Sequence, residues 1–283
     1  MPNTQSAFQT QYRQETVKAF EQNYSLLRVA TVQEAVIKGN TAVFLVAGSG
    51  GVSATTRGVN GYLPFGVINN AQKSCTLVEY HAPFETTDFN IFASQGDQKR
   101  IMQMASVAVM NRNIDQIIIT ELDAGVTNHA GSTAVVGSVD IVERALTILG
   151  NNEVPVDEEQ NLFAIITPAF RSYLRQTTEY SNGQYVDVKP FAGPVRRVWK
   201  WAGINWLTSV RLTGIGTSSE KCYLLHKDSI GHAANMKDME VDVGYERKQK
   251  NSWTNASLYH GAKTLQTAGM VQILHDGSAY AAT

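Results

Sequence analysis

The sequence predicts a mixed α+β fold, and three observations support this prediction. The first is a long hairpin over residues 42–80 whose strands enclose a glycine-rich stretch. The second is a helix pattern from Asp97 to Gly125 with no proline and no internal glycine. The third is the segment NLFAIITPAFRSYLR, where a buried strand ending at Thr167 runs directly into a helix that starts with Pro168. A chain of 283 residues can bury a large core as one elaborate domain or two ordinary ones.

The N-terminal segment is expected to form an amphipathic helix over residues 6–27. Its apolar side chains recur unevenly, at intervals of three to five: Phe8, Tyr12, Val17, Phe20, Tyr24 and Leu27. Such a segment is expected to dock on its own domain or on a neighbour. The first residues lack the apolar run of a signal peptide, and no later stretch approaches the ~18 uninterrupted apolar residues of a membrane helix. We therefore expect a protein that is made in a reducing cytoplasm and makes no membrane contact.

The glycine cluster that begins at Gly48 has the composition of a phosphate-binding turn but not its pattern. A dinucleotide site needs G-x-G-x-x-G opening into a helix, whose first amides bind the pyrophosphate. Gly48 and Gly50 fit, whereas Ser53 takes the third position and the glycines and proline that follow would not form a helix. The Gly-Lys-Ser/Thr of a P-loop is also missing. We therefore predict no nucleotide site in this stretch.

The alternative interpretation of this region is mechanical. A strand is expected from about Thr41 to Ala47, then a long glycine-rich excursion, then a returning strand at residues 74–81. A projecting hairpin of this kind makes few contacts within its own chain.

The long helix from Asp97 to Gly125 carries two apolar stripes that are slightly rotated against each other. At 1.5 Å per residue it would measure roughly 40 Å, which is long for a globular domain. A second helix is expected to start at the N-cap Ser138, with Asp140 in its first turn, and to end at Gly150.

The later part of the chain has mostly strand character. We expect one strand with an aromatic face around Trp199 and Trp201, with Trp206 close by, and its indoles are expected to pack in the core. A stacking platform for nucleic-acid bases is the less favoured role, because it would require more basic surroundings. The C-terminal segment is expected to contain a strand and a short helix in residues 221–236, a half-solvated strand in 240–250, a crossing element, and a terminal strand near residues 268–277.

Composition narrows the classes of function. The chain has 43% hydrophobic and only 17% charged residues, and its net charge is −1. Without an overall basic field, sequence-specific DNA binding is not expected. So few charges are compatible with a surface that is hidden against copies of the same chain. Cys75 and Cys222 stand alone, so we expect buried reduced thiols rather than a zinc site or a disulfide.

No catalytic, cofactor-binding or metal-binding residues are predicted. The histidines lie at positions 81, 129, 226, 232, 260 and 275, and none forms H-x-x-x-H or H-E-x-x-H. His226 and His232 are expected to be polar positions at a strand end and on a helix rather than residues of a cleft. The sequence also lacks the G-x-S-x-G elbow of serine hydrolases, and neither cysteine has the local signature of a nucleophile.

The order of these elements resembles the major capsid proteins of tailed bacteriophages, which share the Hong Kong 97 type of fold with encapsulins and gene transfer agents. The segment QYRQETVKAFEQNYSLL looks like the N-terminal arm of that family, and the hairpin looks like its extended loop (E-loop). The phrases IGHA, YERK and YHGAKTLQTAGMVQI are similar to small phage capsid proteins in particular.

The resemblance implies a division of the chain into four parts. They are an N-arm (1–41), an E-loop (42–80), a peripheral domain (81–123 and 223–283) with a spine helix (97–123), and an axial domain (124–222).

The resemblance also implies a function. The protein would be a non-enzymatic major capsid protein that assembles in the host bacterial cytoplasm as hexamers and pentamers of itself, forming the icosahedral shell of a virion around double-stranded DNA. The DNA would be contacted non-specifically, and portal, scaffolding and decoration proteins are further implied partners. Because the chain begins close to the arm, we expect any scaffold to be a separate protein. The candidate inter-subunit contacts are Phe8, Tyr12, Phe20, Tyr24, Gly50, Gly51, Arg57, Tyr62 and Phe65.

Two alternatives remain open from the sequence. One is an α/β enzyme whose glycine-rich loop covers a substrate, and the other is an encapsulin-like compartment that holds protein cargo.

Overall fold

The computed structural model describes residues 22–33, 35–49, 51–93, 97–178, 198–235 and 240–280. The chain divides into two compact units. Unit 1 consists of Met1–Ser25, Glu79–Asn113 and Met236–Tyr259, and unit 2 consists of Leu26–Val78, Ile114–Asn235 and His260–Thr283. Helix α2 (Gln98–Gly125) and the strands β4 (Val78–Thr87) and β12 (Asn251–Thr264) contribute residues to both units.

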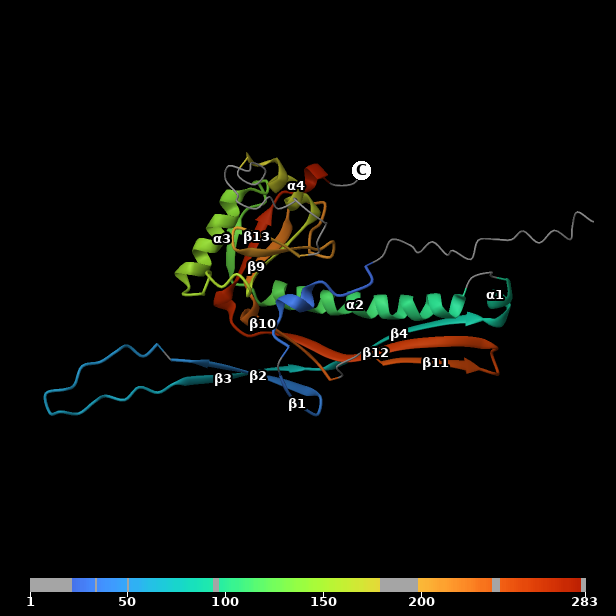
Figure 1. The fold of residues 1–283 in the computed structure, drawn as a ribbon, viewed down its shortest axis with the longest axis horizontal. Helices are drawn as coiled ribbons and strands as arrows, with labels where there is room; N and C mark the ends of the chain where they lie inside the picture. The colour runs from blue at the N-terminus through green and yellow to red at the C-terminus, as the bar shows by residue number, and fades with distance from the viewer. Residues whose placement is uncertain are drawn as a thin grey trace, which may run out of the picture. The chain divides into compact units, whose positions relative to one another are not determined.

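Unit 1 combines the first half of α2 with strands β4, β11 (Glu240–Glu246) and β12 and the short helix α1 (Asp88–Ala93). Both β4 and β11 pair with β12 (Figure 1). Ser106 connects three of these elements, because its hydroxyl donates to the carbonyl of Ala82 at 2.6 Å and accepts from the amide of Ala256 at 2.8 Å. A small hydroxyl residue thus lets helix and strands approach closely without leaving a buried polar group unpaired.

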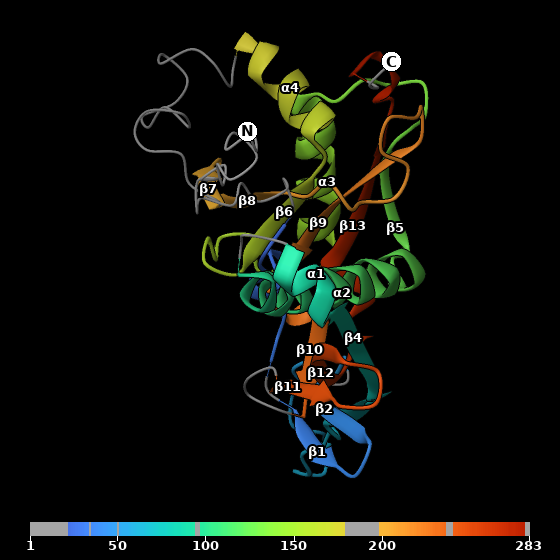
Figure 2. The ribbon, with the colours of Figure 1, turned by 90° about the vertical axis from the view of Figure 1, so that its right-hand side faces the viewer.

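The main sheet of unit 2 has six strands in the order β5-β13-β9-β6-β8-β7 (Figure 2). The pairs β5/β13 and β6/β8 are parallel and the others antiparallel. The strands of this sheet are β5 (Asn128–Gly131), β6 (Leu162–Ile166), β7 (Val198–Trp201), β8 (Ile204–Thr208), β9 (Glu220–His226) and β13 (Met270–His275). Such a mixed sheet needs cover on both faces when its strands are as apolar as β6, whose five residues are all buried.

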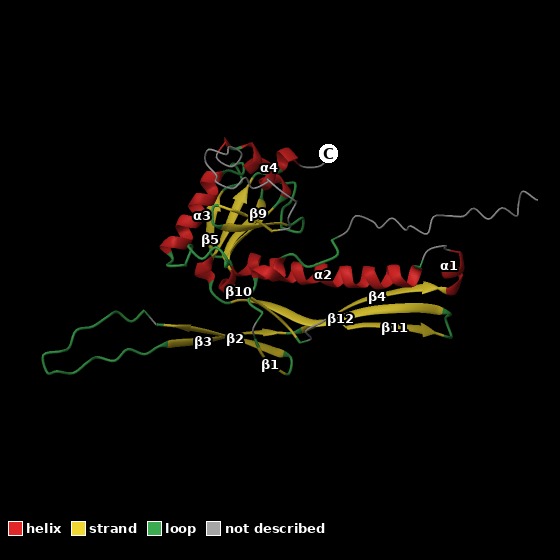
Figure 3. Ribbon diagram, viewed as in Figure 1, coloured by secondary structure: helices red, strands yellow, loops and turns green. Residues whose placement is uncertain are grey.

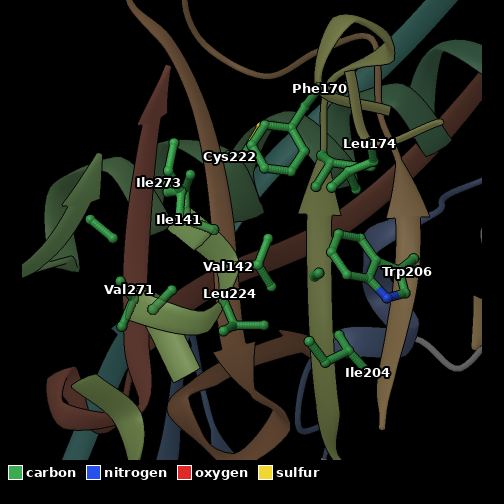
Figure 4. Packing of buried hydrophobic residues seen from close by; sticks show 14 of the residues in the cluster. Ile141, Val142, Phe170, Leu174, Ile204, Trp206, Cys222, Leu224, Val271 and Ile273 are labelled. Carbon is green, nitrogen blue, oxygen red and sulfur yellow. The ribbon is translucent and has the colours of Figure 1, made fainter. Parts of the chain in front are cut away.

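Helices α3 (Val139–Asn151) and α4 (Pro168–Gln176) contribute to the core on one face of this sheet (Figure 4). Trp206 is 0% exposed, and its indole Nε1 donates to the carbonyl of Trp201 at 3.0 Å. Each fully buried large side chain of this kind contributes about 1.5–3 kcal/mol relative to an exposed one. The cluster includes Ile141, Val142, Phe170, Leu174, Trp206, Leu224 and Ile273.

The second half of α2 is tied to β9 by hydrogen bonds at Asp123. Its carboxylate accepts from Lys221 Nζ at 2.9 Å, from Thr213 Oγ1 at 2.6 Å, and from the hydroxyl of Tyr223. Burial alone would raise the pKa of Asp123, but these donors and the Lys221 charge outweigh it and lower that pKa. The carboxylate is therefore held ionised at the end of α2.

A separate three-stranded sheet in unit 2 consists of β1 (Val36–Lys38), β2 (Thr41–Gly48) and β3 (Asn69–Thr76). Strands β2 and β3 are antiparallel and pair without interruption from Thr41↔Thr76 to Gly48↔Asn69. Unit 2 also contains β10 (Ile230–Ala234), which follows the one-turn helix η3 (Lys227–Ser229) and pairs with the end of β12.

Several sequence predictions are confirmed. The long helix is α2, the second helix is α3, and β2 and β13 lie where strands were expected. The strand that runs into a helix is β6 followed by α4, with Pro168 at its start and the Thr167 hydroxyl accepting from the Phe170 amide. Trp199, Trp201 and Trp206 are buried in the core, and both cysteines are buried and free.

Other predictions need correction. The return of the hairpin is β3 at residues 69–76, and β4 is a separate strand, because it pairs with β12 and not with β2. The aromatic strand is two strands, since Ala202 and Gly203 both have positive φ and form a tight turn between β7 and β8.

Four smaller corrections concern local structure. Ser138 has the extended backbone of an N-cap, but its side chain makes no capping hydrogen bond. The short helix expected after β9 is only the turn η3, because the residues after it pair with β12. The apolar side chains of β11 are exposed rather than half buried, as β11 lies at an edge of its sheet; they are Val241, Val243 and Tyr245. Of the predicted N-terminal helix, residues 6–21 lie outside the described residues, and Leu27–Ala30 form a 3-10 turn, η2.

Candidate functional site

The segment between β2 and β3, residues 49–68, is called the distal loop (Figure 3). Its backbone is held by short-range hydrogen bonds within the loop. The Gly58 amide donates to the Tyr62 carbonyl at 3.0 Å, and the Gly61 amide donates to the Gly58 carbonyl at 2.8 Å. Gly66 passes so close to Val52 that a Cβ on Gly66 would lie 2.5 Å from a Val52 methyl group. The distal loop is therefore organised by its own residues.

The distal loop exposes large apolar side chains that a soluble protein normally buries. Tyr62 is 80% exposed and Phe65 is 93% exposed. Further exposed apolar residues in the loop are Val52, Val59, Leu63, Val67 and Ile68. A group of this size within one segment is the kind of surface that marks a protein–protein contact.

The hairpin is anchored at a second place, called the loop base, which comprises Phe44, Cys75, Thr76, Gly231 and Gly261. Phe44 is buried against Gly231 of β10, where a Cβ would lie 2.5 Å from the aromatic ring. At Gly261 of β12 a Cβ would lie 2.9 Å from the Thr76 carbonyl oxygen and 3.5 Å from Cys75 Sγ. Glycine is required at these two positions because the hairpin approaches the β10–β12 backbone so closely.

The segment 26–32 covers another part of the same strands. The amides of Leu26 and Leu27 donate to the carboxylate of Asp115 in α2, at 3.1 to 3.2 Å. Val32 then forms a parallel bridge with Gly231, and its carbonyl accepts from the His232 amide at 2.8 Å. Strand β10 thus lies between this segment and β12.

The predicted contact residues fall into two groups. Gly51, Arg57, Tyr62 and Phe65 all lie in the distal loop and are exposed. Tyr24 is 38% exposed and lies in unit 1. The remaining candidates lie outside the described residues: Phe8, Tyr12, Phe20 and Gly50. Whether any of the nine touches another chain remains a prediction.

Sequence reasoning missed the loop base. Gly231 and Gly261 lie within strands, where an isolated glycine often marks a close backbone approach, so the signal was present. His232, expected on a helix, is buried in β10, and His226 is buried at the end of β9.

A buried polar cluster joins the ends of β6, β9 and β13 but has no catalytic character. His275 Nε2 lies 3.2 Å from both Thr167 Oγ1 and Glu220 Oε2, and burial raises the pKa of the neighbouring Cys222 thiol to about 12. Each of these side chains is at most 1% exposed, so a substrate cannot reach them. Among the residues that the structure describes, no group of three or more histidine, cysteine or acidic side chains is arranged to hold a metal ion.

None of the described helices is both long and apolar enough to span a membrane.

A model of the phage capsid protein family matches residues 4–277. Because this match spans most of the chain, the chain belongs to the phage capsid protein family. A comparison with curated proteins gives no match.

Solved structures have the same fold over nearly the full chain. A structure from Mycobacterium phage Che8 is 15% identical, with a TM-score of 0.73, and covers 94% of this chain and 96% of its own. The capsid of cyanophage P-SCSP1u is 17% identical, with a TM-score of 0.72 and coverages of 95% and 93%. The capsid of a native GTA particle is 12% identical, with a TM-score of 0.71 and coverages of 97% for both chains. The mixed α+β fold is therefore that of Hong Kong 97-type capsid proteins.

The family defines the function at a coarse level. The protein is a major capsid protein of the phage head shell, it is located in the virion, and its role is structural rather than enzymatic. Shell formation means that copies of this chain associate with one another. The family match does not support the alternative hypothesis of an α/β enzyme with a glycine-rich loop over its substrate. It also favours a phage shell over a compartment that holds protein cargo.

Proposed function

We propose that the protein forms the hexamers and pentamers of an icosahedral head of a tailed phage, and that the distal loop joins each subunit to an adjacent copy. The supporting observation is the exposure of Tyr62 and Phe65 within a loop whose backbone hydrogen bonds are internal. An isolated subunit derives little stability from such side chains. If a neighbouring subunit buries them, each large side chain stabilises the contact by roughly 1.5–3 kcal/mol, and this stabilisation is repeated at every such contact around a closed shell.

The proposal assigns the parts of the chain as the resemblance does. Residues 1–41 are the N-arm, and residues 42–80 are the E-loop, which contains the distal loop. The spine helix lies at 97–123 within a peripheral domain of residues 81–123 and 223–283. The axial domain comprises residues 124–222, and strands β9 and β13 complete its sheet.

The contact residues are proposed to work in two ways. Tyr62 and Phe65 supply apolar area, and Arg57, which is exposed nearby in the same loop, supplies a charge for pairing at the rim of the contact. Gly50 and Gly51 let the loop change its angle at its start, and Gly51 has a φ of +72°. Phe8, Tyr12, Phe20 and Tyr24 are proposed to attach the arm to a neighbouring subunit.

The other proposed partners follow from the role of a head. A chain with a net charge of −1 can enclose double-stranded DNA without binding it tightly, so DNA contacts are expected to be weak and independent of sequence. Portal, scaffolding and decoration proteins would meet the shell at its outer or inner face. Assembly is proposed to occur in the cytoplasm of the host bacterium.

A double substitution in the distal loop tests the proposal. Tyr62→Ser with Phe65→Ser is expected to reduce the yield of particles at least tenfold, measured by sedimentation and negative-stain microscopy, because it removes two side chains that a neighbour would bury. The matched control is Phe89→Ser, which removes a phenylalanine of α1 that is 74% exposed and lies outside the loop. Normal particle yield from the double variant, or an equal loss in the control, would overturn the role of the loop.

A further inference from the structure

Two buried histidines contact each other on one face of the paired strands β10 and β12. His232 Nε2 lies 3.2 Å from His260 Nδ1, and the ring centroids are 5.4 Å apart. The side chains are 1% and 0% exposed. Among the described residues, His232 Nδ1 has no hydrogen-bond partner. A proton added to His232 Nδ1 would therefore create an N–H group without an acceptor and a buried positive charge, and both cost free energy.

The pair lies on the face of β10–β12 opposite to the loop base. In this register His232 pairs with Ala262, and His260 pairs with Ala234, whereas Gly231 and Gly261 are the preceding and following residues. Successive side chains of a strand point to opposite faces. The histidines therefore lie beneath the two glycines against which the hairpin packs.

The charged groups around the pair further disfavour protonation of the two imidazole rings. Arg28 of η2 is the cation that acts on both rings. Among the acids of α2, Asp115 accepts from the Leu26 and Leu27 amides, Glu121 binds Lys263 and the Thr264 amide, and Asp123 binds Lys221. On the opposite face β3 contributes the neutral thiol of Cys75, whose pKa is raised by burial. Burial, then the neighbouring His260 and Arg28, lower the pKa of His232 to about 3, and burial and Arg28 lower that of His260 to about 4.

We propose that the His232–His260 pair is an acid-sensitive latch that holds β10 on β12 and thereby keeps the hairpin seated at the loop base. Protonation of either ring places a charge beside Arg28 in a buried site. The two strands then separate locally, and Phe44 and Cys75 lose the backbone against which they pack. This inference does not depend on which neighbour the distal loop contacts.

The direction of the pH dependence follows from proton binding. A histidine in the opened strands has an ordinary pKa near 6.5, so the opened form binds protons more readily than the closed form. The latch is therefore at full strength above about pH 6.5 and weakens as the pH falls toward the lowered pKa values. Within this window the opening constant rises by up to about tenfold per pH unit for each histidine.

Cys75 offers a direct readout of opening. It is 8% exposed and lies at the loop base, whereas Cys222 is 0% exposed in the core of the six-stranded sheet. The reaction of each thiol with a dithiodipyridine reagent would be followed by peptide mass spectrometry and normalised to the urea-unfolded chain at the same pH. Between about pH 7 and about pH 5 the normalised rate for Cys75 is expected to rise at least tenfold, while Cys222 stays protected.

Substitutions assign the effect to the pair. His232→Gln and His260→Gln each remove one of the two titrating rings, so each variant is expected to lose about half of the logarithmic rise in the Cys75 rate, and combining them is expected to flatten the profile to within about twofold. The matched control His129→Gln removes an exposed histidine of β5 and is expected to keep the wild-type profile. A wild-type Cys75 rate that stays flat, or that rises only together with Cys222, would overturn the latch even if neither glutamine variant folds. An unchanged slope in both variants would overturn it as well.

Discussion

The distal loop and the six-stranded sheet of unit 2 contain similar apolar residues, but the sheet buries them and the loop exposes them. In the sheet, aromatic and aliphatic side chains such as Trp206 and Phe170 are fully buried by α3, α4 and one another. In the loop, Tyr62 and Phe65 are mostly exposed, and the glycine-rich backbone is ordered by internal turns. The sheet stabilises a single chain, whereas the loop carries apolar area that its own chain leaves exposed and that we propose a second chain buries.

This difference separates folding from assembly within one sequence. Substitutions in the sheet are expected to act on the free energy of unfolding, and substitutions in the distal loop on the association of subunits. The loop base lies between these cases, because it buries Phe44 and Cys75 within the chain but carries the segment that projects from it.

The largest effect on stability is expected in the sheet. Trp206→Ala removes an indole that is 0% exposed and stacks beside Trp199 at a centroid distance of 6.2 Å. The free energy of unfolding is expected to fall by about 3–5 kcal/mol, as measured by urea denaturation, because the substitution leaves a cavity. A loss below about 1 kcal/mol would mean that this core is not the stabilising part of unit 2.

An intermediate effect is expected at the loop base. Gly231→Ala would bring a methyl group to 2.5 Å from the Phe44 ring, and the strain is expected to cost about 1–3 kcal/mol. The matched control is Gly150→Ala in α3, where a Cβ meets nothing within 4 Å and the better helix former should stabilise by up to about 1 kcal/mol. Changes of opposite sign in the unfolding free energies of the two variants would support the close approach of Gly231 to Phe44, and equal small changes would contradict it.

The smallest effect on stability is expected in the distal loop. Tyr62→Ser with Phe65→Ser is expected to change the unfolding free energy of the isolated subunit by less than about 0.5 kcal/mol, because these side chains are exposed before assembly. The measurement is urea denaturation of subunits kept dilute enough to remain unassembled. A loss above about 2 kcal/mol would show that the loop packs on its own chain and would erase the contrast with the sheet.

The sequence was sufficient for elements with strong local signals. Helix α2 is a run of 28 residues with no proline and with glycine only at its last position, and the junction of β6 and α4 has a proline at the first helical position with Thr167 as its cap. The exposed loop was also predictable, because its glycines exclude a helix and its apolar residues follow no periodic pattern. These features depend on a few neighbouring residues, which a sequence displays directly.

The errors came from interactions between distant residues. The turn at Ala202 and Gly203 splits one expected strand because β7 pairs back on β8, and η3 is short because Ile230 and its successors pair with β12. The loop base and the histidine pair arise only when β10 and β12 become neighbours, and the two histidines are 28 residues apart in the chain. Periodicity cannot reveal such a pairing, although a glycine inside each strand hints at it.

Because β2 and β3 pair without interruption, the length of the distal loop does not affect how the hairpin is anchored at the loop base. Eight cross-strand pairs end at Gly48↔Asn69, so residues inserted or removed beyond that pair would leave Phe44 opposite Lys73, and Cys75 opposite Ala42, unshifted. The distal loop can therefore lengthen or shorten without any compensating change at the loop base.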